Sequence, residues 1–199
     1  MIAGPSEVVV VADDTAKASF VAADMLAQVE HDEMAAALLL TPSQTLASQV
    51  TLEINRQVEQ SSRKKIIQKS LSRYCAIIVT KSVEEGVDIA NAFAPEHLEL
   101  MVRNPKTILK KVRNAGSVFL GHYTPEALGD YTAGTNHILP TGGTARFSSP
   151  LGVYDFYKRM SVLSFSREAF QKLSEPTARF AQREGLDAHA NSVLVRTTK

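Results

Sequence analysis

Short apolar runs alternate with longer amphipathic segments along the first 121 residues. The runs are rich in Val, Ile and Leu and have the length of buried strands: 7–13, 35–41, 75–80, 98–102 and 117–121. Apolar residues at helical spacing lie between them, in segments 15–32, 43–72 (one long or broken helix), 82–94 and 105–114. This alternation predicts an α/β fold with a mainly parallel sheet and helices on both faces.

The pattern changes after the fifth run. Residues 121–150 are polar and rich in Gly, Thr and Pro, and a connection of this length is usually either functional or disordered. Its Tyr, His, Leu and Ile residues favour a functional loop. From about residue 153 a helical pattern returns, so we predict an α/β domain over 1–150 and a helical C-terminal tail over 151–199.

Composition narrows the class of protein. The 199 residues are 44% hydrophobic and 22% charged, which is typical of a globular domain. The formal net charge of +1 shows no bias toward nucleic acid or an anionic membrane, and no apolar run reaches the roughly 20 residues of a membrane span. A single cysteine, Cys75, excludes an intrachain disulfide and suits a reducing compartment. With no signal peptide at its start, the chain is expected in the cytoplasm.

An acid and an imidazole stand side by side in an otherwise apolar stretch. Glu96 and His97 directly follow Pro95, in "NAFAPEHLELM". This pairing is typical of proton-transfer groups, because carboxylates and imidazoles are the usual acids and bases of enzymes. Sites in parallel sheets form outside the carboxyl ends of the strands, so we expect the pair and the loop 121–150 to meet there.

Several further side chains have metal-ligand or substrate-binding chemistry. Gln28 and His31 are three residues apart near the end of a predicted helix, where an amide oxygen and an imidazole nitrogen can reach one metal. Alternatively, His31 only stabilises the helix end. Asp130 is a ligand or a turn residue, His137 a substrate contact or a loop hydrogen-bonder, and His189 a ligand or an exposed tail residue. Nitrogen and oxygen donors without thiolate suit Zn²⁺, with Mn²⁺ or Co²⁺ as substitutes.

Nucleotide-binding glycine motifs are missing from the sequence. No G-x-G-x-x-G follows a predicted strand, no phosphate-binding G-x-x-x-x-G-K-[ST] occurs, and "TGGTAR" at 141–146 is typical of a turn. The residues by themselves therefore predict an α/β domain with a metal-assisted acid/base site, and leave the reaction open.

Five motifs, in order and spread over nearly the whole chain, resemble histidinol dehydrogenase: "AGPSEVVVVAD", "DMLAQVEHD", "NAFAPEHLEL", "GDYTAGTNHILPTGG" and "EGLDAHANSV". The resemblance implies a zinc-dependent homodimer that oxidises L-histidinol to L-histidine through an aldehyde, in two NAD-dependent steps of histidine biosynthesis.

The resemblance also implies roles for individual residues. The zinc ligands would be Gln28, His31, Asp130 and His189, with substrate completing the coordination. His97 would accept the hydroxyl proton, and Glu96 would activate the water that hydrates the aldehyde. Further substrate contacts would come from Ser6, His137 and Glu184. The tail would reach into a dimer partner, so that Glu184 and His189 complete the partner's site.

Members of that family carry roughly as much chain again before "AGPSEV". The resemblance therefore implies an incomplete Rossmann-like domain, with the main NAD-binding region outside this sequence and no cofactor-binding residue assigned. Two alternatives stay open. One is a non-catalytic module that binds zinc and an imidazole compound. The other is a zinc hydrolase in which Glu96 activates a metal-bound water.

Overall fold

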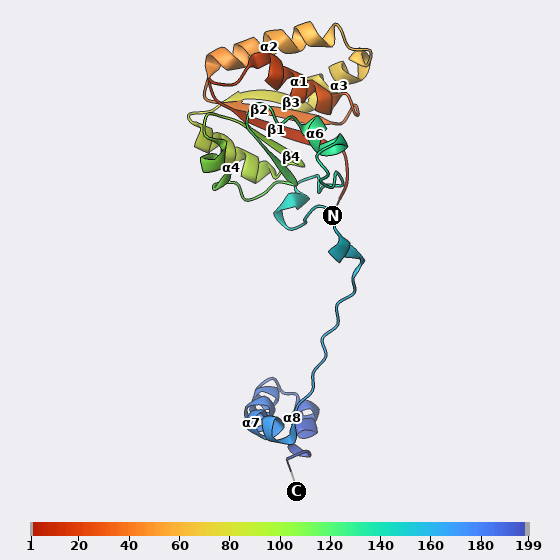
Figure 1. The fold of residues 1–199 in the computed structure, drawn as a ribbon. Helices are drawn as coiled ribbons and strands as arrows, with labels where there is room; N and C mark the ends of the chain where they lie inside the picture. The colour runs from red at the N-terminus through yellow and green to blue at the C-terminus, as the bar shows by residue number, and fades with distance from the viewer. Residues whose placement is uncertain (1, 198–199) are drawn as a thin grey trace. The chain divides into compact units, whose positions relative to one another are not determined.

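A computed structural model describes residues 2–197, which form two compact units. The first unit ends at Phe156, and the second begins at Tyr157 (Figure 1). Each has its own internal packing. Among the residues described, no helix combines the length and the apolar character needed to cross a membrane.

The first unit is built on a five-stranded sheet in which every strand pair is parallel. In chain order its strands are β1 (Glu7–Ala12), β2 (Ala36–Thr41), β3 (Cys75–Val79), β4 (His97–Met101) and β5 (Ser117–Leu120). Their spatial order is β3-β2-β1-β4-β5, that of the first five strands of a doubly wound sheet. The predicted α/β class and parallel sheet are confirmed.

Helices cover both faces of this sheet (Figure 1). One face packs against α1 (Ala18–Val29), α2 (Gln44–Val58) and α3 (Lys64–Tyr74), and the other against α4 (Val83–Phe93) and α5 (Pro105–Leu109). The predicted helical segment 43–72 is broken between α2 and α3. Ser43 and Ser82 cap α2 and α4, because each hydroxyl accepts a hydrogen bond from a backbone N–H three residues later.

Alternation along the strands divides the buried side chains between the two faces. The valines of β1 contribute to both apolar cores and are all buried. On β4, Leu98 and Leu100 pack on the α4 side, whereas His97 and Glu99 turn toward α1. The α1 face of the sheet therefore carries buried ionisable groups as well as apolar ones.

The predicted loop 121–150 contains regular structure. It forms α6 (Glu126–Tyr131) and a short 3-10 turn, η1 (Thr144–Arg146). Glu126, Gly129 and Thr144 are buried, so this connection packs onto the sheet instead of running freely over the surface.

The helical tail begins later than predicted. After the 3-10 turn η2 (Val153–Phe156), residues 157–166 are not helical, and the second unit consists of α7 (Arg167–Arg183) packed on α8 (Asp187–Leu194). Ser166 sets the start of α7, because its hydroxyl accepts a hydrogen bond from the backbone N–H of Ala169. The prediction of helix from residue 153 is wrong for this stretch: its apolar side chains, although three residues apart at several positions, are exposed and have no surface among residues 2–197 to pack against.

Candidate functional site

Glu96 and His97 lie where β4 begins. His97 is the first residue of the strand and pairs in register with Val8, next to the start of β1. The expectation that this pair lies outside the carboxyl ends of the strands is therefore wrong. The reason is local: Ala94, in a left-handed conformation (φ 58°), ends α4, and Pro95 leads directly into the strand. The acid–histidine pair is thus held at the amino ends of β1 and β4.

The imidazole of His97 is buried and has one defined hydrogen-bonding side. Its Nδ1 lies 2.9 Å from Oε1 of Gln28 and 3.3 Å from the carbonyl oxygen of Glu7. Both oxygens are acceptors, so Nδ1 carries the proton and donates. Nε2 is then the unprotonated nitrogen, and no partner for it occurs within residues 2–197. Burial lowers the pKa of His97 to about 4, which keeps the ring neutral near pH 7.

Glu96 is held beside this ring. Its Oε2 accepts a hydrogen bond from the backbone N–H of Glu7 at 3.0 Å and lies 3.6 Å from Nδ1 of His97. The Ser6 side chain also hydrogen bonds this carboxyl. Burial, followed by the negative charges of Glu7 and Asp130, raises the pKa of Glu96 to about 7 against these hydrogen bonds. A carboxyl with this pKa exchanges a proton readily near neutral pH.

The short helix α6 adds two more carboxyls. Glu126 and Asp130 are four residues apart and therefore share one face of the helix. Glu126 is only 3% exposed, and its Oε1 lies 3.8 Å from Nδ1 of His97. Burial, then the charges of Asp130 and Glu96, raises the pKa of Glu126 to about 8. Its Oε2 is buried without a hydrogen-bond partner in the described chain.

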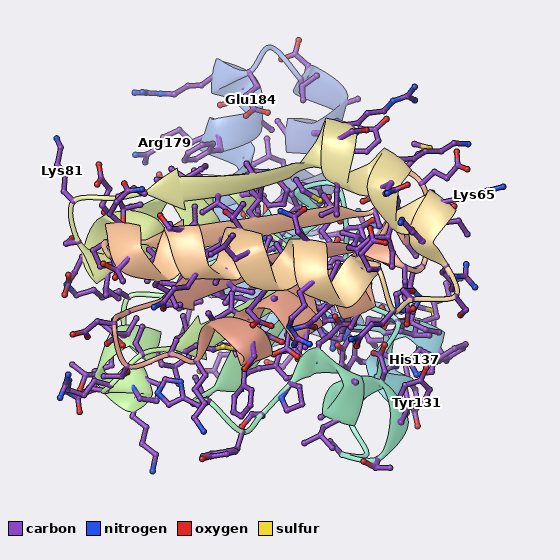
Figure 2. The ribbon with its side chains drawn as sticks, turned by 90° about the horizontal axis from the view of Figure 1, so that it is seen from above. Lys65, Lys81, Tyr131, His137, Arg179 and Glu184 are labelled. Atoms are coloured by element: carbon purple, nitrogen blue, oxygen red, sulfur yellow. The ribbon has the colours of Figure 1, made fainter. Side chains whose placement is uncertain are left out.

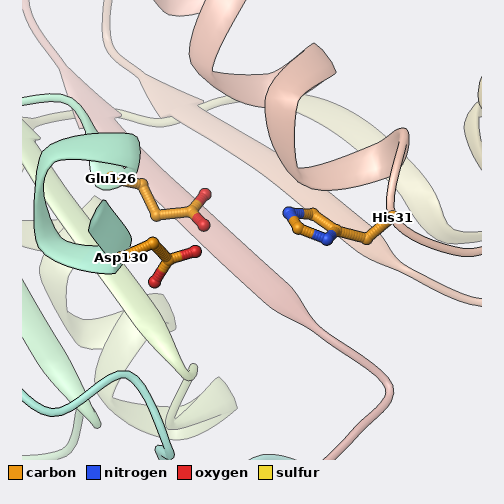
Figure 3. Close-up of side chains that lie close together, drawn as sticks. All are labelled: His31, Glu126 and Asp130. Atoms are coloured by element: carbon orange, nitrogen blue, oxygen red, sulfur yellow. The ribbon is translucent and has the colours of Figure 1, made fainter.

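His31 faces these two carboxyls from the end of α1. One ligand atom from each of His31, Glu126 and Asp130 lies within 4.8 Å of the other two, and Figure 3 shows the three side chains converging. One imidazole and two carboxylates are donors that suit Zn²⁺ or Mn²⁺. A divalent cation would also offset the repulsion among the crowded acids, and the unpartnered Oε2 of Glu126 could serve as one of its ligands. These residues therefore fit a metal.

Of the other predicted residues of the first unit, two contact the Glu96–His97 pair and one is exposed elsewhere. Gln28 is 1% exposed, and its amide oxygen is bound to His97. Ser6 contacts Glu96. His137 is exposed, in the segment that follows α6, and Figure 2 shows it at the outside of the unit. The structure thus brings Ser6 and Gln28 to the proton-transfer pair.

Two predicted residues belong to the second unit. Glu184 ends α7, and His189 is an exposed residue of α8 whose carbonyl oxygen accepts a hydrogen bond from the Ser192 hydroxyl. Their assignment as substrate contact and metal ligand stays a prediction.

The sequence reading missed several buried acids. Glu126 lies within 121–150, whose polar composition predicts a loop, although "PEALGD" places Pro before a glutamate four residues from Asp130. Glu99 had a clearer signal: it is an acid at the centre of "HLELM", on the same side of the strand as His97. An acid inside an apolar strand indicates a site more strongly than an exposed acid does.

Comparison with known proteins gives a consistent result. The profile of the histidinol dehydrogenase family matches residues 1–197. The histidinol dehydrogenases of Aquifex aeolicus and Lactococcus lactis are 55% and 52% identical over 196 residues, which are 98% of this chain and 46% of each relative. A crystal structure of histidinol dehydrogenase from Elizabethkingia anophelis aligns with a TM-score of 0.90 at 39% identity, covering 99% of this chain and 45% of that one. This chain spans about half the length of the curated relatives it matches.

Proposed function

Because the chain belongs to the histidinol dehydrogenase family, we propose that it supplies the substrate- and metal-binding part of an NAD-dependent oxidation of L-histidinol to L-histidine. One observation carries the proposal. A neutral imidazole with a free Nε2, His97, stands next to Glu96 and to a cluster of metal-ligand type. Oxidation of an alcohol through an aldehyde to an acid needs one base for the hydroxyl proton and one for the attacking water, and His97 and Glu96 can supply them.

The first oxidation requires a proton acceptor for the substrate hydroxyl. Nε2 of His97 takes this proton while the carbon of the alcohol gives a hydride to NAD⁺, which leaves the aldehyde and NADH. Two features support the role: Nδ1 is occupied by Gln28 and Glu7, and the unprotonated Nε2 has no competing partner among residues 2–197. The low pKa of the buried ring keeps Nε2 unprotonated near pH 7.

The second oxidation requires water to add to the aldehyde. Glu96 takes a proton from the attacking water, and the hydrate then gives a second hydride to another NAD⁺ to form the carboxylate. The pKa of Glu96, about 7, places its proton exchange at the pH where such a base works best. The neighbouring Glu96 and His97 would therefore each serve a separate proton transfer.

We propose Gln28, His31, Asp130 and His189 as the metal ligands, with Glu126 close enough to join them. Zn²⁺ fits this donor set best and Mn²⁺ also suits it. Such an ion, when bound, would supply positive charge that holds the substrate's imidazole and amino group in place. Ser6, His137 and Glu184 would add substrate contacts.

We further propose that the tail, residues 151–199, completes the site of a second copy in a homodimer. Large apolar side chains are exposed along residues 157–165 of the isolated chain, namely Tyr157, Met160, Val162, Leu163 and Phe165. Such a run is typical of a surface that a partner covers. NAD would be bound chiefly by the portion of the family's chain that this sequence does not span.

The test is formation of NADH from L-histidinol and NAD⁺ in the presence of Zn²⁺. The chain is assayed alone and together with the separately expressed portion of the Aquifex aeolicus relative that it does not match. We expect activity only in the mixture, and its loss in His97→Asn but not in the control His122→Asn. A folded, metal-loaded mixture that produces no NADH would contradict the proposal.

The clustered ligand-type side chains of His31, Glu126 and Asp130 also support one alternative: a module that binds metal and an imidazole compound without oxidising it. Calorimetry distinguishes the two. Zn²⁺-dependent binding of L-histidinol to the chain, with no NADH in any mixture, would support the binding module. If no Zn²⁺-dependent binding occurs, that alternative is removed.

A further inference from the structure

Glu99 is the most deeply buried acid of the site region. It is 1% exposed, in the middle of β4, and its side chain points toward α1. Its neighbours in the strand, Leu98 and Leu100, lie on the other face and are apolar, as is usual for a strand buried on both faces. An acid at this position is costly to bury unless its oxygens are bound.

Only Oε1 of Glu99 has a hydrogen-bond donor among residues 2–197: it accepts from the backbone N–H of Glu126 at 3.0 Å, whereas Oε2 is buried without one. The carboxyl of Asp24 in α1 faces Glu99, and a proton held by either acid would join the two carboxyls by a hydrogen bond. Burial and the charge of Asp24 raise the pKa of Glu99 well above its usual range, and burial raises that of Asp24 to about 6.

The bond to Glu126 replaces a missing helix cap. Pro125, which precedes α6, has no side chain that can accept from the first N–H groups of the helix. Glu99 provides this acceptor from a neighbouring strand. It therefore fixes where α6 begins, and with it the positions of Glu126 and Asp130 on the helix.

The bond to Asp24 ties the same carboxyl to α1. Asp24 lies four residues before Gln28 and hence on the same face of α1, and this helix leads to His31. The two sides of the metal-ligand cluster come from these two helices, His31 from the end of α1 and the carboxyls from α6.

We propose that Asp24 and Glu99 form a positioning pair, which joins α1, β4 and α6 and so sets the spacing between His31 and the two carboxyls of α6. Neither residue belongs to the proposed set of metal ligands or substrate contacts. Its effect on metal binding rests on the proposed function, whereas its capping of α6 does not.

Two substitutions in the whole chain separate positioning from simple packing. In Glu99→Gln the amide oxygen still accepts from Glu126 and the NH₂ group donates to Asp24, so we expect Zn²⁺ affinity within about threefold of the unmodified chain. Glu99→Leu fills the same space without a cap, and we expect affinity about 10–100-fold weaker, the usual effect of losing an outer-shell contact. Competition with a chromophoric chelator measures both.

Stability separates the positioning role from simple packing. Glu99→Leu removes the cap of α6 and leaves Asp24 without its partner, so we expect a lower urea midpoint than in Glu99→Gln, while both chains stay folded in the absence of urea, where affinity is measured. Leu100→Ala, on the other face of the same strand, is the control: it also lowers the urea midpoint but should leave Zn²⁺ affinity unchanged. If Glu99→Gln loses as much affinity as Glu99→Leu, or if neither loses any, the proposal is wrong.

A third measurement does not need a metal. Hydrogen exchange at the backbone amide of Glu126 should be slow in the unmodified chain and in Glu99→Gln, and at least about tenfold faster in Glu99→Leu. If the unmodified chain binds no Zn²⁺, the metal assignment fails, while this measurement still tests the pair. Unchanged protection in Glu99→Leu would overturn the capping role.

Discussion

The two faces of β4 differ sharply although they alternate residue by residue. Leu98 and Leu100 join an apolar cluster beneath α4, whereas His97 and Glu99 form buried polar contacts beneath α1 and α6. One short strand thus carries both apolar packing residues and buried ionisable ones. The difference teaches that a strand can direct these two kinds of residue to opposite sides of the same backbone.

The polar face needs support that the apolar face does not. The acids that meet there have raised pKa values because burial and mutual repulsion disfavour their charged forms. The apolar face is held by dispersion and the hydrophobic effect alone. Substitutions on the two faces should therefore change different properties, and the following five substitutions test this, beginning with the largest expected effect on stability.

Leu98→Ala should be the most destabilising. Leu98 is fully buried, and truncating such a side chain costs about 2–5 kcal/mol of unfolding free energy. Urea unfolding measures it, with Leu52→Ala, at a 70% exposed position, as the control. Metal affinity under native conditions should stay unchanged. A large loss of affinity in the folded variant would show that the two faces are not independent.

Glu126→Gln should alter how stability depends on pH. The pKa of Glu126 is about 8 in the folded chain against an ordinary 4.5, so its contribution is present below pH 4.5 and is lost as the pH rises through 8. The glutamine variant should lack this loss, which is on the order of 4 kcal/mol between about pH 5 and about pH 8.5. Urea unfolding with a chelator at about pH 5 and about pH 8.5 measures it. If the free energy of unfolding changes by the same amount between the two pH values in both chains, the assigned pKa is contradicted.

His97 acts in the opposite direction and sharpens that experiment. Its pKa is about 4 when folded against an ordinary 6.5, so its contribution is present above pH 6.5 and is lost as the pH falls toward 4. His97→Gln should therefore remove a decline in stability on the acid side only. Glu168→Gln, at an exposed position of α7, is the control for both variants.

Gly129→Ala should have an intermediate effect. A Cβ at this position would lie 2.8 Å from a ring carbon of Phe119, which in turn packs near the His97 ring. Relieving the clash moves α6 and costs about 1–3 kcal/mol. Unlike Leu98→Ala, this variant should also weaken Zn²⁺ binding, because α6 carries Glu126 and Asp130. Ala127→Ser, on the exposed side of α6, is the matched control.

His31→Ala should have the smallest effect on stability. His31 is exposed, so we expect a change within about 0.5 kcal/mol. Its loss should nevertheless weaken Zn²⁺ binding by 10-fold or more, on the order of 1.4 kcal/mol or above. His137→Ala, which removes another exposed imidazole, should leave the affinity unchanged. Equal binding by His31→Ala and the unmodified chain would remove His31 from the site.

The strands and their parallel arrangement were predictable from the sequence, because buried parallel strands form continuous apolar runs. The pairing of Glu96 with His97 was visible for the same reason, as a polar interruption of such a run. Helix α6 was not predicted, since it has only six residues and begins at a proline without a side-chain cap of its own. Its cap comes from Glu99, 27 residues earlier in the chain.

Long-range contacts also explain why the position of the site was mispredicted. Glu7 meets Glu96 across 89 residues, and Gln28 meets His97 across 69 residues. Local patterns contain no information on which end of the sheet such residues share. The resemblance to a family implied a role for each residue. The burial and the protonation state of these residues could be obtained only from the fold.

The short junction between α4 and β4 determines which chemistry β4 presents. Ala94 and Pro95 are all that separates the last turn of α4 from the acid and the imidazole. Because side chains of a strand alternate, gaining or losing one residue here would rotate β4 by half a turn and put Leu98 and Leu100 where His97 and Glu99 now lie. The number of residues in this junction therefore decides which side chains β4 turns toward α1.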